Sequence, residues 1–301
     1  MNLNEYLVFV IEHKCNSKCG ICFIEGSEEQ LADLRKVSLP LFKKALDVIP
    51  KGMYSGIVFS GGEVTLSEEL PEYAAYARDK GFDNIMIQTN ARALSNYKKV
   101  QEFKAAGINH YFVSFHSADY DLSDKITGKS GAHAQTVKGL ENLRDLGLTV
   151  FTNTVMSSLN YKVLPGVGEY LQTFKNIIGM HFWGYVPMTL QASELLLPYE
   201  SAAPYLNQTI KYLLDHHRKI CVKFFPVCLL DEPYKKFHDN RQPITFGIID
   251  KFVDQRFEAC DYKTYPCCGG SDCIGLPKMY RDTMAPDHWM SLKKINVGSK
   301  A

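Results

Sequence analysis

The chain of 301 residues is 46% hydrophobic and 22% charged, and its formal net charge at pH 7 is +1. This balance excludes a polybasic nucleic-acid surface and an acidic tail. No apolar run is long enough to span a membrane, and the start of the chain lacks a basic n-region and a cleavage site, so we expect a cytosolic protein. The nine cysteines are an odd number in a long chain, which favours reduced, metal-bound thiols over a disulfide scaffold.

Apolar runs alternate with helix-period segments along the first two thirds of the chain. The runs predict strands over 6–11, 56–59, 84–88, 111–115, 149–155 and 180–186. Amphipathic stretches predict helices over 40–49, 67–80, 95–106, 132–146 and 164–174. Ser67 and Ser95 are predicted N-caps, and Gly81, Gly107 and Gly147 are predicted helix stops. Such alternation implies βαβ units and a parallel α/β sheet, and six units predict an incomplete barrel.

Two motifs follow the first two predicted strands. The first is a C-x3-C-x2-C run, Cys15, Cys19 and Cys22. A [4Fe-4S] cluster normally takes four thiolates, so three on one loop indicate an open iron reserved for a small chelating molecule. The second motif is Ser60, Gly61, Gly62 and Glu63. Two glycines let the backbone approach a ligand closely, and a carboxylate accepts from an ammonium, although this motif alone is also compatible with an ordinary turn.

Together with Phe23 directly after the third cysteine, these motifs resemble the radical S-adenosylmethionine (SAM) superfamily. The resemblance implies a (β/α)6 partial TIM barrel over residues 1–190. It also implies a [4Fe-4S] cluster on the three cysteines, with the amino and carboxylate groups of SAM on its open iron. The Gly-Gly-Glu loop would bind the methionine amino group.

Polar residues stand where the later predicted strands end, which is where a parallel barrel meets its ligand. Thr89-Asn90 resembles the family's third-strand signature, and Ser114 and Asn153 occupy positions that often bind SAM. Each of these polar groups could instead cap a neighbouring helix or turn. His116 is as compatible with a structural hydrogen bond as with catalysis.

The pattern changes beyond Pro187. We expect a loop over 188–198, a helix over 202–219 and a short strand over 222–225, so that 191–225 connects two domains. Residues 226–301 resemble the small, cysteine-rich Twitch and truncated SPASM domains, which carry one auxiliary iron-sulfur cluster. The resemblance implies four ligands: Cys228, Cys260, Cys267 and Cys273.

Cys267 and Cys268 are adjacent where a C-x2-C pair is usual in such domains, so the choice of ligand within this pair is open. A spare Cys268 could donate a hydrogen atom to a substrate radical. Structural zinc is the alternative for four thiolates, although the usual zinc spacing is absent. Cys221 is interpreted as an inert core thiol.

The resemblance implies an enzyme that cleaves SAM reductively to a 5′-deoxyadenosyl radical, which abstracts hydrogen from a carbon of a peptide or small molecule. Maturation, epimerisation and dehydrogenation are all compatible outcomes, and a flavodoxin or ferredoxin is the expected electron donor. Few residues precede the first predicted strand, which disfavours a fused leader-peptide domain. An electron-transfer protein and a non-catalytic zinc or iron-sulfur module are the alternatives, and neither needs the Gly-Gly-Glu loop.

Overall fold

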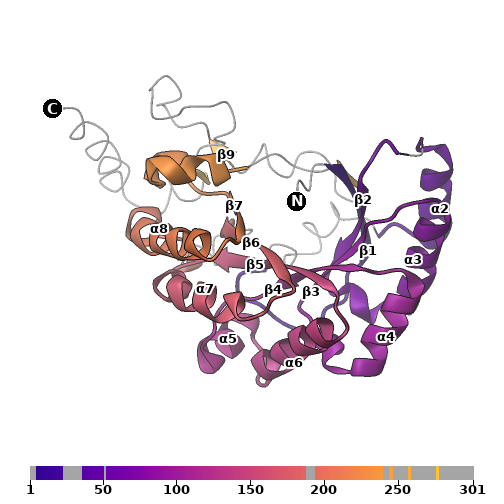
Figure 1. Ribbon diagram of the computed structural model, residues 1–301, viewed down its shortest axis with the longest axis horizontal. Coiled ribbons are helices and arrows are strands. Elements are labelled where there is room, and N and C mark those ends of the chain that lie inside the picture. The colour runs from indigo at the N-terminus through magenta and orange to yellow at the C-terminus, as the bar shows by residue number, and fades with distance from the viewer. Residues whose placement is uncertain are drawn as a thin grey trace.

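The computed structural model describes residues 5–22, 36–50, 52–187 and 194–239, together with three short strands at 244–246, 257–258 and 276–277. Its centre is an eight-stranded sheet in the order β7-β6-β5-β4-β3-β2-β1-β8. Every neighbouring pair in this sheet is parallel. The sheet is curved, and helices α2 to α7 lie along its convex side (Figure 1). The α/β partial-barrel fold is therefore confirmed.

The strands of the main sheet are β1 (Tyr6–Glu12), β2 (Gly56–Gly61), β3 (Ile85–Thr89), β4 (His110–Ser114), β5 (Thr149–Met156), β6 (Ile177–Gly184), β7 (Lys219–Lys223) and β8 (Ile244–Phe246). A separate antiparallel pair consists of β9 (Phe257–Glu258) and β10 (Leu276–Pro277). The helices are α2 (Leu39–Val48), α3 (Leu70–Asp79), α4 (Tyr97–Ala106), α5 (Tyr120–Thr127), α6 (Ala132–Asp145), α7 (Leu164–Gln172) and α8 (Tyr199–Asp215). Short 3-10 turns include η2 (Val64–Leu66), η3 (Ala93–Ser95) and η6 (Val227–Leu229). In the described part of the chain, no helix is both long and apolar enough to cross a membrane.

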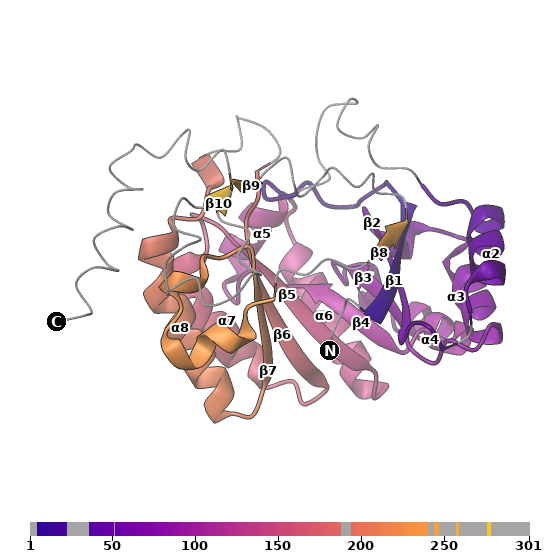
Figure 2. The ribbon, with the colours of Figure 1, turned by 90° about the horizontal axis from the view of Figure 1, so that it is seen from above.

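All six predicted barrel strands and all five predicted helices are present, with ends shifted by a few residues. The strand expected at 222–225 lies at Lys219–Lys223 and pairs with β6, so the barrel sheet continues past its sixth strand (Figure 2). Helix α5 was not predicted. It has eight residues, which is too short for its apolar period to stand out.

Both predicted N-caps are wrong. Ser67 is the C-cap of η2 and Glu69 is the N-cap position of α3, whereas Ser95 is the last residue of η3. Helix α4 is capped instead by Asn96, whose side chain accepts from the Lys98 N–H at 3.1 Å. The three predicted glycine stops are confirmed, since each follows its helix with a positive φ of 89°, 108° or 66°.

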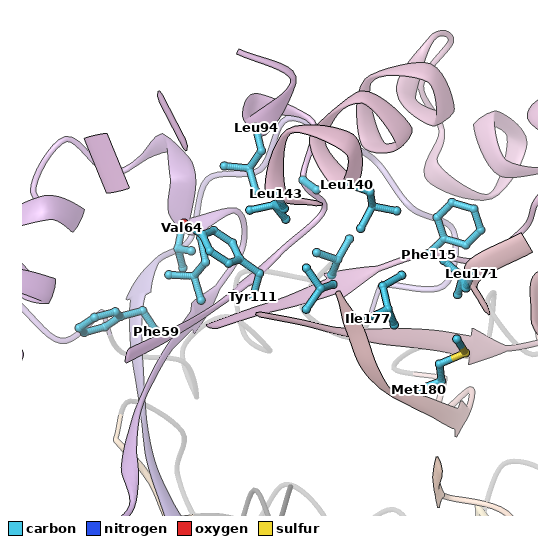
Figure 3. Close-up of a cluster of buried hydrophobic side chains, with 14 of the residues drawn as sticks. Phe59, Val64, Leu94, Tyr111, Phe115, Leu140, Leu143, Leu171, Ile177 and Met180 are labelled. Carbon is cyan, nitrogen blue, oxygen red and sulfur yellow. The ribbon is translucent and has the colours of Figure 1, made fainter. Parts of the chain in front are cut away.

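The two faces of the sheet bury different clusters, because successive side chains of a strand point to opposite faces. Outward-facing side chains such as Phe59 and Tyr111 pack against the helices, and Figure 3 shows Leu140 and Leu143 of α6 in this cluster. The inner face carries an apolar group made of Tyr6, Val8, Val58, Met86, Phe112 and Phe151. Beyond this group, toward the carboxyl ends of the strands, the inner face becomes polar, which places the candidate site there.

Candidate functional site

The loop that follows β2 lies directly on the chain that leaves β1. The Gly62 N–H donates to the Glu12 carbonyl at 2.7 Å, and the Glu63 N–H donates to the Lys14 carbonyl at 2.8 Å. Gly61 has a φ of 138°, and a Cβ on Gly62 would lie 2.5 Å from the His13 carbonyl oxygen. The glycines therefore allow the close approach of two backbone segments, whereas the sequence predicted a close approach to a ligand.

Glu63 is fully buried at the start of η2. Its Oε1 accepts from the Thr65 N–H at 3.1 Å, from the Thr65 hydroxyl at 2.6 Å and from the Thr89 hydroxyl at 2.7 Å. Its Oε2 accepts from the Asn90 N–H at 2.7 Å. The carboxylate thus ties the loop after β2 to the end of β3. Its contact with the SAM ammonium stays a prediction.

The loop after β3 holds the first cysteine segment in place. The Asn90 Nδ2 donates to Asn16 Oδ1 at 2.7 Å. The buried Arg92 donates through Nη1 to the Ser17 hydroxyl at 3.0 Å and to the Asn16 carbonyl, and through Nε to Gln135 Oε1 at 2.8 Å. Asn90 was predicted from the sequence, whereas Arg92 was missed. Arg92 stands two residues after Asn90, in the loop that follows the third strand, and this position was the signal by which the sequence could have indicated it.

Helix α5 holds the same cysteine loop from the other side. The Lys18 N–H donates to the Thr127 carbonyl at 3.0 Å, and the Gly20 N–H donates to the Ile126 carbonyl at 3.1 Å. These carbonyls belong to the last turn of α5, where helix carbonyls lack partners within the helix. The unpredicted helix therefore anchors the loop that carries the predicted cluster ligands.

Cys15 is exposed, and Cys19 and Cys22 are half-buried. The Ser17 N–H lies 3.4 Å from the Cys15 Sγ, and the Asn90 Nδ2 lies 3.9 Å from it, so two donors face this sulfur. Although the residue as a whole is exposed, desolvation of its sulfur and the nearby Glu63 charge raise the pKa of the Cys15 thiol above its ordinary value. The backbone N–H groups of Ser17 and Asn16 and the Arg92 charge oppose this shift.

No three His, Cys, Asp or Glu side chains converge, within the described ranges, as the ligands of a single metal ion would. A four-iron cluster is different, because each thiolate binds a separate iron and the ligands stand further apart. Donors aimed at sulfur also suit such a cluster, since hydrogen bonds to the sulfurs help to set its potential. The three cysteines on a loop held from both sides therefore fit a cluster better than a single ion.

The remaining predicted strand-end residues lie on the inner face. The Ser60 hydroxyl donates to Gln88 Oε1 at 2.5 Å. Ser114 and Asn153 are neighbours across β4 and β5, and the buried Asn153 Oδ1 has no hydrogen-bond partner among the described residues. His116 is buried, its Nδ1 accepts from the Val155 N–H at 3.3 Å, and burial lowers its pKa to about 4. The structural role considered for His116 is therefore the one observed.

The cysteines of the last third are only partly within the described residues. Cys228 lies in η6 and is half-buried. Cys221 lies on β7 and is half-buried, and it faces the inner side of the sheet because its neighbour Val222 points into the outer core. It therefore lies outside the fully buried core, and its inertness stays a prediction. Phe23, Cys260, Cys267, Cys268 and Cys273 lie outside the described residues.

Comparisons with known proteins agree with this geometry. A family model described as the Radical SAM superfamily matches residues 10–168. The chain is similar to an Fe-coproporphyrin III synthase of Methanosarcina barkeri, with 28% identity over 76% of this chain and 57% of the relative. It is also similar to an AdoMet-dependent heme synthase of Nitratidesulfovibrio vulgaris, with 24% identity over 74% of this chain and 59% of the relative. A PqqA peptide cyclase of Bradyrhizobium diazoefficiens matches with 28% identity over 52% of this chain and 40% of the relative.

The chain thus spans about half the length of the curated relatives it matches. Among solved structures, Streptococcus suis SuiB superposes with a TM-score of 0.58 and 15% identity, over 72% of this chain and 49% of that one. This likeness supports the fold alone.

Proposed function

The chain belongs to the radical SAM superfamily of enzymes, and from this premise we propose that it cleaves SAM reductively and uses the 5′-deoxyadenosyl radical to abstract hydrogen from a substrate carbon. The observation that carries the proposal is the bracing of the three-cysteine loop by the loops after β2 and β3 and by α5. A non-catalytic metal-binding module has no need for this arrangement at the carboxyl end of a parallel sheet.

Each set of residues has a distinct task in this proposal. A [4Fe-4S] cluster held by Cys15, Cys19 and Cys22 would supply the electron. Asn90 and Arg92 keep the cysteine loop in one conformation. Ser114 and Asn153 offer polar atoms to SAM on the inner face, and Phe23 and the backbone of the Gly-Gly-Glu loop complete its binding site. The apolar inner layer below, which includes Phe112 and Phe151, excludes water from the radical.

The extent of the similarities favours a small molecule over a peptide as the substrate. The two relatives named for Fe-coproporphyrin III and heme synthesis match about three quarters of the chain, whereas the peptide cyclase matches about half. A tetrapyrrole is therefore the first substrate class to test, with a peptide as the alternative. The reaction is an oxidation, an epimerisation or a maturation step.

We also propose an auxiliary iron-sulfur cluster on Cys228, Cys260, Cys267 and Cys273, within residues 226–301, a segment that also contributes β8 to the barrel sheet. Its support is the cysteine pattern, since Cys228 alone of the four lies in the described residues. Cys268 is the proposed hydrogen donor to the substrate radical. A cytoplasmic location and a flavodoxin or ferredoxin as electron donor belong to the same proposal.

Anaerobic reconstitution followed by SAM titration tests the function. We expect SAM to change the spectrum of the cluster and dithionite to yield 5′-deoxyadenosine. The triple variant Cys15→Ala, Cys19→Ala, Cys22→Ala should lose about four irons per chain and all SAM cleavage. An electron-transfer protein would hold its clusters without responding to SAM, and a zinc module would contain no iron. Undiminished 5′-deoxyadenosine from the triple variant would overturn the proposal.

A further inference from the structure

Arg92 is a buried cation without an acidic partner in the described part of the chain. The residue is 8% exposed, and each ion pair within those ranges joins other side chains. The buried Glu63 on the preceding loop accepts instead from neutral donors of Thr65, Thr89 and Asn90. Because buried charges in folded proteins are paired with a charged group, Arg92 indicates an anion beside it.

The guanidinium of Arg92 faces the cysteine loop. Its Nη1 donates to the Ser17 hydroxyl at 3.0 Å and to the Asn16 carbonyl, and its Nε donates to Gln135 Oε1 at 2.8 Å. The Ser17 N–H in turn lies 3.4 Å from the Cys15 Sγ. A single residue, Ser17, therefore stands between the buried positive charge and the sulfur of the first proposed cluster ligand.

The backbone before Arg92 is held in a left-handed turn. Ala91 has a φ of 61°, a conformation that residues other than glycine rarely adopt. The Ala91 N–H donates to the Thr89 hydroxyl at 2.9 Å, and the Arg92 N–H donates to Asn90 Oδ1 at 3.0 Å. Helix α6 closes on this turn, since a Cβ on Gly139 would lie 2.4 Å from the Ala91 carbonyl oxygen. Such strain is typical of functional sites, and here it fixes the place of the arginine.

The proposed cluster supplies the anion that this charge faces. A four-iron cluster with three thiolate ligands is anionic, and one added electron increases its negative charge. A nearby positive charge stabilises the reduced cluster more than the oxidised one, because the attraction grows with the charge of the cluster. The charge of Arg92 should therefore favour the entry of the electron.

We propose that Arg92 is a positioning residue that holds the cysteine loop and, through its positive charge, raises the reduction potential of the cluster on Cys15, Cys19 and Cys22. The proposal rests on the function proposed above, which requires this cluster to accept one electron from an external carrier. The electron adds to the cluster, and no bond is made or broken at Arg92. The hydrogen bonds of Arg92 and its charge can be changed separately.

The test is an anaerobic redox titration of the reconstituted holoenzyme without SAM, followed by electron paramagnetic resonance. The signal to follow is the one that the triple variant Cys15→Ala, Cys19→Ala, Cys22→Ala lacks. We expect Arg92→Gln to lower the equilibrium constant for one-electron reduction at least tenfold, which is a shift of about 59 mV to a more negative potential. Arg92→Lys keeps the charge, so its shift should be less than half as large. It loses the fork of hydrogen bonds and should release iron to a chelator faster than the parent.

Two further variants separate the charge from the packing. Gln135→Glu keeps an acceptor for Arg92 Nε and adds a negative charge, so it should lower the same equilibrium constant at least about threefold with the iron content unchanged. The matched control is Lys98→Gln, which removes an exposed positive charge from the next helix, α4. Its effect should be less than about twofold, because solvent screens an exposed charge.

The outcomes decide between charge, packing and function. An unchanged potential in an Arg92→Gln variant that retains the cluster would overturn the inference, as would equal shifts in Arg92→Gln and Arg92→Lys. If Arg92→Gln loses the cluster, Gln135→Glu decides, and an unchanged potential there overturns the role of the charge. Failure of the parent to cleave SAM, with the expected shifts in potential, would overturn the proposed function and leave this inference in place.

Discussion

Glu63 shows how a single buried carboxylate organises the site. A charge removed from water is costly unless it is paired or hydrogen-bonded, and Glu63 receives bonds from Thr65, Thr89 and Asn90. Asn90 in turn holds Asn16 beside Cys15. Glu63 therefore acts on the cysteine loop through Asn90, in addition to any contact it makes with SAM.

Replacing Glu63 by Gln should destabilise the protein by about 1–3 kcal/mol. The amide NH2 would face an N–H or O–H donor, which leaves a buried polar group without an acceptor. Chemical unfolding measures the loss, and the exposed Glu68→Gln is the matched control, for which we expect almost no change. The SAM prediction requires a fall in SAM affinity of at least tenfold in addition. Unchanged stability with weakened SAM binding would show that the carboxylate serves the ligand alone.

At the scale of elements, backbone contacts between loops decide the geometry of the site. The loop after β2 approaches the exit of β1 so closely that Gly62 has no space for a side chain, whereas Gly166 in helix α7 has open space around it. The same substitution should therefore have opposite effects at the two positions.

Gly62→Ala should lower the iron content and the unfolding midpoint, because its Cβ would overlap the His13 and Lys14 carbonyls. Gly166→Ala should raise the free energy of unfolding by about 0.5–1 kcal/mol, since alanine loses less entropy in a helix. Iron analysis and thermal unfolding of both variants check the pair. Normal iron content in Gly62→Ala would contradict the close packing of these two loops.

The link between β4 and β5 makes part of the stability depend on pH. His116 accepts from the Val155 N–H as a neutral imidazole, and burial lowers its pKa from 6.5 to about 4. As the pH falls below 6.5, the unfolded chain takes up this proton before the folded chain does. The contribution of His116 is therefore complete above 6.5 and is lost progressively down to about 4.

His116→Asn keeps an acceptor for Val155 and does not titrate in this range. We expect the variant to lose less stability than the parent between pH 7.5 and pH 5.5, by up to about 1 kcal/mol for each pKa unit crossed. Denaturant midpoints at the two pH values measure the difference. An identical pH dependence in parent and variant would contradict the neutral, buried state of His116.

For the whole molecule, the metal content shows whether the barrel and the cysteine-rich tail each hold an iron-sulfur cluster. If both proposed clusters are present, reconstituted protein should bind about eight irons per chain and no stoichiometric zinc. Cys268→Ala should retain this iron, whereas Cys267→Ala should lose one cluster. Loss of a cluster in Cys268→Ala alone would reverse the choice within the pair. Equimolar zinc with about four irons would remove the auxiliary cluster.

The sequence by itself determined the parallel barrel and the place of its polar end, because both depend on local signals. Periodicity distinguishes strands from helices, and a parallel barrel presents its strand ends at one face, so Cys15, Glu63, Asn90 and Asn153 could be assigned to one site before any contact was known.

Only the tertiary structure decided which groups touch. That Gly62 packs on β1, that Arg92 and the last turn of α5 hold the cysteine loop, and that Lys223 lies beside Trp183 depend on pairs far apart in the chain. Helix α5 was too short to show an apolar period. The sequence also does not distinguish a buried lysine side chain from an exposed one. The physical reason is that burial and hydrogen-bond partners are properties of packed elements, whereas periodicity is a property of one element alone.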